Sequence, residues 1–186
     1  VRQDLADLKL PPTVPNFYHP DSLWSYEAGT KSRLLDGKLT LSAAAFYLDW
    51  KDIQQDVNLP TAGYDFETNA GKAKSYGVEF EARWLATEAL TLNAGAGYTH
   101  ATFAETTDAL GQSQGQFNAL KGERVQGVPK WNALLGAEYR FGAAFVRGTG
   151  RWVGSSRGDL DRDSSDYVRA GYFTADASGG LTLDKW

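Results

Sequence analysis

Apolar and polar residues alternate along most of this chain, and helical periodicity is nearly absent. The clearest stretch runs from Leu90 to Thr99, where Leu, Ala and Tyr occupy every second position and Thr, Asn and Gly fill the others. The same alternation recurs over 76–84, 131–141 and 144–152. Such a period of two is typical of strands with one apolar and one polar face. We therefore predict an all-β chain of antiparallel strands.

The pattern predicts seven long strands, several of which are joined by very short connections. Asp36-Gly37 is the sequence expected of a tight two-residue hairpin turn, because both central positions need a positive φ. Further short connections fall at 86–89 and at Gly142-Ala143. The predicted strands cover residues 22–34, 38–54, 67–85, 90–104, 124–141, 144–155 and 168–183.

The other connections are long and polar, and they fall near 55–66, 105–123 and 156–167. Long and short connections therefore alternate, so the repeated unit is a long hairpin. Short turns at one end of the strands and long loops at the other are typical of membrane β-barrels, with periplasmic turns and extracellular loops.

The apolar faces mix small residues with aromatic ones, whereas the interior of a soluble sandwich favours bulky Val, Ile and Leu. Tyr and Trp favour the headgroup level of a membrane, where the ring is buried and the polar tip stays wet. Between aromatic positions lie about 9–11 residues, enough for a tilted strand to cross the hydrocarbon. We favour an antiparallel transmembrane barrel, with a soluble antiparallel β-sandwich binding module as the alternative. The aromatic residues near strand ends are Trp24, Tyr26, Tyr47, Trp50, Trp84, Tyr98, Trp131, Tyr139 and Trp152.

The opposite faces of the same strands are charged with both signs, and in a barrel they would line a wet lumen. The residues concerned are Glu27, Lys31, Arg33, Glu79, Glu81, Arg83, Glu138, Arg140, Arg147 and Arg151.

Composition narrows the choice of function. No window approaches the ~18 consecutive apolar residues of a membrane helix, which excludes a helical membrane protein but not a barrel. The absence of cysteine removes disulfides, thiol catalysis and cysteine-based metal sites. With a net charge of -4 and no basic run, we expect no nucleic-acid partner.

Residues Pro20 to Gln55 resemble a characteristic segment of TonB-dependent outer-membrane receptors, in which a Ser-Tyr-Glu-x-Gly-x-Lys run, a short turn and a strand ending in Asp-Ile-Gln follow one another. Further matches occur downstream in the same order as in the family, through the segments 69–84 and 122–133. Single motifs are weak, but several in the right order make the resemblance specific. The matching residues are Pro20, Tyr26, Glu27, Gly29, Lys31, Phe46, Tyr47, Asp49, Trp50, Asp52, Ile53, Gln54, Asn69, Gly71, Gly77, Glu79, Gly122, Val128 and Pro129.

The resemblance implies a bacterial outer-membrane barrel of roughly twenty-two strands around a separate plug domain. We interpret residues 1–186 as part of the C-terminal half of such a barrel domain, without the plug, and 1–20 as a loop or strand remnant. The whole receptor would import a scarce ligand such as a ferric siderophore, with energy from the TonB complex, and would not be an enzyme. Outer-membrane lipid and lipopolysaccharide would surround it. TonB would contact parts absent from this chain. A passive outer-membrane porin or an outer-membrane hydrolase, with the same barrel but no plug, is a further alternative.

Ligand contacts are expected in the long loops and at the outer mouth of the lumen. Arginine and aromatic side chains suit an anionic iron chelate through charge-assisted hydrogen bonds and stacking. The same residues could instead pack loops or face lipopolysaccharide. The candidates are Tyr64, Phe66, Phe117, Arg124, Arg151 and Arg157.

We predict neither a metal site nor a cofactor. The acidic run from Asp159 to Asp166 resembles the start of a calcium loop, but Ser164 and Ala170 occupy the positions that need glycine and glutamate. The two histidines, His19 and His100, lie far apart and have no cysteine beside them.

Overall fold

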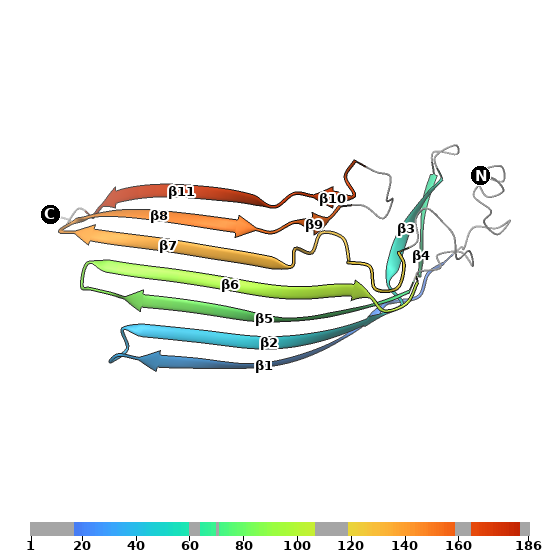
Figure 1. The fold of residues 1–186 in the computed structure, drawn as a ribbon, viewed down its shortest axis with the longest axis horizontal. Coiled ribbons are helices and arrows are strands. Elements are labelled where there is room, and N and C mark those ends of the chain that lie inside the picture. The colour runs from blue at the N-terminus through green and yellow to red at the C-terminus, as the bar shows by residue number, and fades with distance from the viewer. Residues whose placement is uncertain (1–16, 60–63, 70, 107–118, 159–164, 183–186) are drawn as a thin grey trace.

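The computed structural model describes residues 17–59, 64–69, 71–106, 119–158 and 165–182. One antiparallel sheet of seven long strands dominates, and neighbours in the sheet are also neighbours among the long strands of the sequence (Figure 1). The predicted all-β antiparallel fold is therefore confirmed. The strands, in sheet order, are β1 (Ser22–Leu34), β2 (Leu39–Lys51), β5 (Lys72–Leu85), β6 (Leu90–Phe103), β7 (Trp131–Phe141), β8 (Ala144–Val153) and β11 (Tyr172–Leu181).

The short turns lie together at one end of the sheet. Gly142-Ala143 forms the predicted two-residue turn, in which Phe141 pairs with Ala144 and Gly142 has a φ of 62°. A positive φ at the first central residue is the hairpin geometry that glycine favours. The connection 86–89 also has its predicted length, since β5 ends at Leu85 and β6 begins at Leu90.

The expected two-residue turn at Asp36-Gly37 is wrong in length. The last pair of the ladder joins Leu34 to Leu39, so four residues make the connection. Leu35, Asp36 and Gly37 all have positive φ, at 54°, 54° and 84°. Three successive left-handed residues curl the chain away from the ladder one residue earlier than a two-residue turn would.

At the other end of the sheet, the predicted loop 55–66 is also wrong, because most of it is a hairpin. Residues Gln54–Leu59 form β3 and Tyr64–Asn69 form β4, which pair as a separate two-stranded sheet. Accordingly, the predicted strands 38–54 and 67–85 each break where this hairpin begins.

Two other predicted strands are too long. The strand expected over 124–141 starts at Trp131, since Pro129 has no N–H to donate and Gly127 has a φ of 73°. The strand expected over 168–183 divides into β10 (Val168–Arg169) and β11, and β10 pairs with β9 (Ser156–Arg157).

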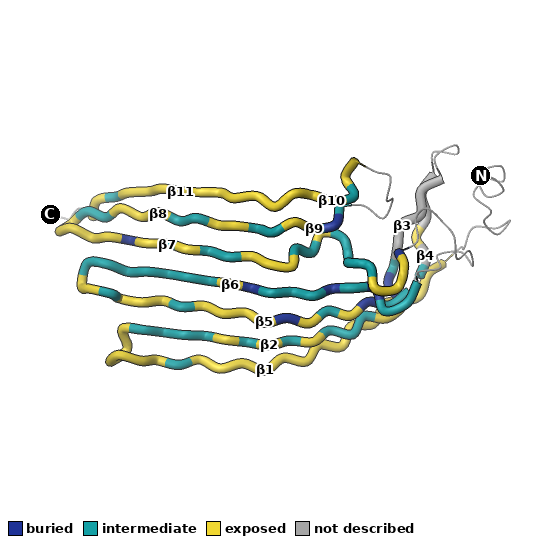
Figure 2. Tube along the Cα trace, in the orientation of Figure 1, coloured by how far each residue is buried: buried dark blue, intermediate teal, exposed yellow. Residues whose placement is uncertain are grey.

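The apolar face of the sheet is uncovered. Among the described residues no second sheet packs on it, which argues against the β-sandwich alternative, and most of the long strands are exposed or half-buried (Figure 2). No described helix is long and apolar enough to span a membrane. The exposed residues of this face include Trp24, Tyr26, Tyr47, Tyr76, Val78, Phe80, Trp84, Trp131, Leu135, Tyr139, Val146, Trp152 and Phe173.

Aromatic residues align into a row across this face near the end opposite the short turns. The register pairs Tyr26 with Tyr47, Tyr47 with Tyr76, and Tyr76 with His100. Tyr76 and Trp84 are eight positions apart on β5, which is roughly 26 Å along a strand. That length is comparable with the apolar band of a membrane barrel, which is about 25 Å tall between its aromatic girdles.

The described core is small. Ile53, Ala73, Phe103 and Ala119 form one buried cluster at the end that carries β3 and β4, and Trp50 packs against it. The long strands therefore depend on hydrogen bonds to their neighbours and on the medium that covers the apolar face.

Candidate functional site

The polar face of the sheet contains an open hollow of about 710 Å³. We call it the polar hollow. It spans β1 to β8, and its walls are formed by alternate residues of the strands, because these point to the same side of the sheet. The charged residues that line it are Lys31, Arg33, Glu79, Glu81, Arg83 and Arg151.

Glycines on β6 form the bottom of the polar hollow, because they carry no side chain that would fill it. A Cβ built on Gly95 would have its nearest neighbour, the carbonyl oxygen of Phe80, at 3.8 Å, so the space above this residue is open. The side-chain amide of Asn132 lies over Gly97, where a Cβ would come 2.8 Å from its nitrogen. Backbone and amide groups therefore form the floor, with charged side chains on both sides.

The charges of the polar hollow are not neutralised by one another. Within the part of the chain that the structure describes, none of its six charged side chains has an ion-pair partner within 4.0 Å. Four cations and two anions leave a net charge of 4 − 2 = +2. Such groups are available to whatever occupies this face.

A different arrangement lies nearer the short turns, where Glu138 is 7% exposed. Its carboxylate accepts hydrogen bonds from Nε of Arg140, at 2.7 Å, and from Nε of Arg147, at 2.9 Å. Glu138 and Arg147 are opposite each other on β7 and β8. This trio joins the two strands and engages the Glu138 carboxylate within the sheet.

The candidate Arg124 lies in the connection before β7, at the end of the sheet away from the short turns. Its Nη2 donates to the carbonyl oxygens of Val128, at 3.0 Å, and Ser155, at 2.9 Å. The guanidinium thus ties its own connection to the one that follows β8.

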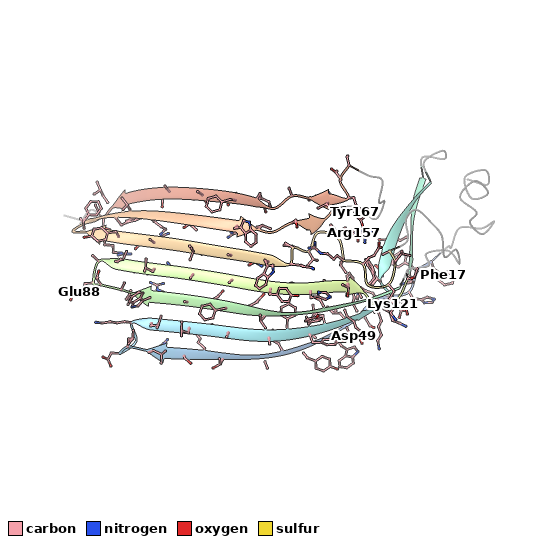
Figure 3. The ribbon with its side chains drawn as sticks, in the orientation of Figure 1. Phe17, Asp49, Glu88, Lys121, Arg157 and Tyr167 are labelled. Atoms are coloured by element: carbon pink, nitrogen blue, oxygen red, sulfur yellow. The ribbon has the colours of Figure 1, made fainter. Side chains whose placement is uncertain are left out.

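The candidate Arg157 is 4% exposed. Its Nη1 lies 3.0 Å from Oε2 of Glu123, and its guanidinium lies 4.8 Å from the ring centroid of Tyr167. Figure 3 shows Arg157 and Tyr167 at the same end of the molecule as Lys121, far from Glu88 in a short turn. Here the charge holds together the connection between β6 and β7, at 120–128, and both arms of the connection between β8 and β11, at 154–158 and 165–169.

Of the candidate ligand residues whose side chains the structure describes, Arg151 lines the polar hollow, whereas Arg124 and Arg157 do not. Tyr64 and Phe66 are the first and third residues of β4, paired with Leu59 and Val57. Phe117 lies outside the described residues. The lumen charges expected from the alternation, such as Glu79 and Arg83, do line the hollow.

Metal ligands do not gather in the described part of the chain. No group of three or more His, Asp or Glu residues is close enough there to hold an ion. Most of the acidic run 159–166 lies outside the described residues.

Comparison with known proteins decides the family. Residues 6–186 match the family described as TonB dependent receptor-like, beta-barrel. The chain belongs to this family. Its members are outer-membrane transporters and not enzymes. The polar face of this receptor segment is thereby the lumen side of a barrel wall, and the apolar face is the lipid side.

Individual receptors resemble the segment in sequence. It is 27% identical over 164 residues to the metal-pseudopaline receptor CntO of Pseudomonas aeruginosa, which covers 86% of this chain. It is 30% identical over 161 residues to the pesticin receptor of Yersinia enterocolitica, which covers 84% of this chain. In both cases the segment spans 21% of the length of the relative.

Solved structures agree with this placement. The ferric yersiniabactin uptake receptor FyuA of Yersinia pestis superposes with a TM-score of 0.65 at 27% identity, over 87% of this chain and 22% of that one. The copper transporter OprC gives a TM-score of 0.67 at 16% identity, over 91% of this chain and 24% of that one, and supports the fold alone.

Proposed function

We propose that the whole receptor imports a metal chelate, such as a ferric siderophore, across the outer membrane. The proposal rests on two relatives at 27% identity, one named as a metal-pseudopaline receptor and the other as a ferric yersiniabactin uptake receptor. The segment described here would supply barrel wall, lumen lining and outer loops. Its family membership favours this role over that of a passive porin.

The charges of the polar hollow support a ligand of this kind. Metal chelates of the siderophore type carry carboxylate, catecholate or hydroxamate oxygens, which accept strong hydrogen bonds from arginine and lysine. Lys31, Arg83 and Arg151 present such donors around the polar hollow. The carboxylates of Glu79 and Glu81 interrupt the positive charge, so the wall can bind an anion weakly enough to release it.

We propose Arg151 as the foremost ligand contact among the six candidates, since it lines the hollow and forms no ion pair with a described residue. Tyr64 and Phe66 belong to the β3–β4 hairpin at the outer end and could add aromatic stacking. Phe117 remains a candidate from its place in the sequence. Arg124 and Arg157 hold loops together, so their contribution to binding would be through loop position.

The proposal includes two partners. We expect transport to require the TonB complex, in keeping with the family's name. We also expect outer-membrane lipid and lipopolysaccharide to cover the apolar face, whose aromatic row matches the headgroup level.

The test uses the intact receptor in a bacterium that lacks its own receptors for ferric chelates. Growth under iron limitation is measured with a panel of ferric hydroxamates, catecholates and carboxylates, with and without a functional TonB complex. We expect one chelate class to restore growth only when TonB is present. Rescue by no chelate, or equal rescue without TonB, would contradict the proposal.

A substitution then tests the site with the chelate that restores growth. Arg151→Gln should weaken binding by roughly tenfold or more, because a hydrogen bond to a charged group contributes about 1.5–3 kcal/mol. Arg140→Gln is the matched control, since Arg140 is engaged with Glu138. Equal affinities for the two variants would remove Arg151 from the site.

A further inference from the structure

The β3–β4 hairpin meets the main sheet at a joint with unusual backbone geometry. The ladder of β2 and β5 ends with Lys51 opposite Lys72, and that of β3 and β4 begins with Gln54 opposite Asn69. Between them, Asp52 and Gly71 both have left-handed backbones, with φ of 54° and 84°. Figure 1 shows the hairpin turning at a steep angle to the strands that carry it.

Few backbone hydrogen bonds cross this joint. The N–H of Ile53 donates to the carbonyl oxygen of Gly71 at 3.2 Å, a long bond. The side chain of Ile53 is buried in the small core with Phe103 and Ala119, which seats the base of the hairpin on the sheet. One long bond and one apolar anchor restrain the position of the joint but leave its angle weakly fixed.

A segment before β1 supplies the missing restraint. The amide side chain of Asn69 forms three bonds: Oδ1 accepts from the N–H of His19 at 2.6 Å, and Nδ2 donates to the carbonyl oxygens of His19, at 2.9 Å, and Asp52, at 2.7 Å. One residue thus joins both sides of the joint to a chain segment fifty residues away.

Further contacts extend this attachment on either side. Nε2 of Gln54 donates to the same His19 carbonyl oxygen at 3.2 Å, and Nε1 of Trp50 donates to Asp21 at 2.6 Å. A hydrogen bond with the Glu67 carboxylate raises the pKa of Tyr18 above its usual value. Residues 17–21 therefore lie along the base of the hairpin, and we call them the strap.

We infer that the joint at Asp52 and Gly71 is a hinge and that Asn69 is the latch that fixes its angle to the strap. With the latch closed, the strap and the β3–β4 hairpin form one unit at the outer end of the barrel wall. With the latch open, the hairpin is free to pivot about the Ile53 anchor. The device regulates the shape of the outer mouth, and this inference stands independently of which ligand enters there.

The experiment measures the hinge angle directly in the intact receptor, in detergent and without ligand. The 186-residue chain has no cysteine, so in a receptor without cysteines elsewhere spin labels can be placed by Asn58→Cys on β3 and Lys121→Cys in the connection between β6 and β7. Pulsed electron resonance then gives the distribution of distances between them. The parent should give one narrow distribution, and Asn69→Ala should broaden it at least about twofold or add a second population.

Matched variants keep the result interpretable. Asn93→Ala removes an asparagine of the lumen face whose side chain forms no hydrogen bond to a described residue, and should leave the width unchanged. Asn69→Asp keeps the shape but turns the two donations into repulsion, so it should broaden the distribution as well. If Asn69→Ala fails to assemble, Asn69→Asp and Gln54→Ala carry the test. Widths equal to the parent in every assembled Asn69 and Gln54 variant would overturn the inference.

Discussion

At the scale of single residues, one tight contact in the wall is between an aromatic ring and a glycine. Phe46 on β2 lies directly opposite Gly77 on β5, and its ring covers the glycine. A Cβ on Gly77 would come 2.6 Å from Cζ of Phe46 and would also overlap the carbonyl oxygen of Tyr98. The ring thus takes the space that a second side chain would need, a known way of stabilising glycine in a sheet.

Gly77→Ala should therefore destabilise the barrel, because both the ring and the backbone of β6 have to move. Overpacking of this kind costs about 1–3 kcal/mol. The measurement is the temperature at which the intact receptor loses its folded mobility on a detergent gel. Gly95→Ala is the control, since its new methyl group would have no neighbour closer than 3.8 Å. Equal midpoints for the two variants would show that the Phe46–Gly77 contact is not tight.

At the scale of elements, the sequence predicted the strands better than the ends where the loops lie. Alternation identifies β6 and β7 because lipid and water impose opposite demands on their two faces. Over 54–69 alternation is present but confined to two runs of six residues, in which Val57 is paired with Phe66 and Leu59 with Tyr64. Runs this short in a stretch rich in polar residues are interpreted as a loop. The register there depends on pairing with the partner strand, which a local pattern does not record.

The candidate site was predictable to a similar extent. The charged residues of the polar hollow, including Arg151, were predicted from the alternation of residues between the two faces of each strand. The roles of Arg124 and Asn69 were not predictable, because their partners are backbone carbonyl groups brought close only by the fold. Asn69 contacts His19 across fifty residues of sequence. Phe117 lies outside the described residues, so only its place in the sequence supports it as a ligand contact.

The two connections that Arg157 joins, at 120–128 and at 154–158 with 165–169, form a rim that gives a prediction at this scale. Glu123 accepts a hydrogen bond from the N–H of Leu120 at 2.7 Å and pairs with Arg157. Glu123→Ala removes both, so the connection around Lys121 should open more often. Trypsin should then cleave the intact receptor after Lys121 faster, by roughly tenfold for a local loss near 1.4 kcal/mol.

Glu105→Ala provides the comparison for that experiment. This substitution breaks the ion pair between Glu105 and Lys72, whose side chains are 46% and 43% exposed, respectively. Exposed ion pairs contribute little to stability. The cleavage rate of Glu105→Ala should match the parent. A Glu123→Ala receptor that resists trypsin as well as Glu105→Ala does would mean that the Glu123–Arg157 contact does not hold the rim.

At the scale of the whole molecule, the sheet has two different surroundings. Among the residues that the structure describes, none covers its apolar face, and none forms an ion pair with the charges around the polar hollow on the other face. A soluble protein rarely exposes so large a continuous apolar surface. Membership of the receptor family explains both faces, with lipid on one side and the lumen on the other.

The most direct test of this account is the environment of successive residues along β6 in the intact receptor embedded in lipid. Single nitroxide labels from Leu90 to Tyr98 are compared for collision with oxygen, which dissolves in the hydrocarbon, and with a water-soluble nickel chelate. We predict a period of two, with oxygen favoured at Leu92, Ala94 and Ala96 and lower oxygen contact at the residues between them. No alternation, or oxygen favoured at Asn93, Gly95 and Gly97, would contradict the assignment of the two faces.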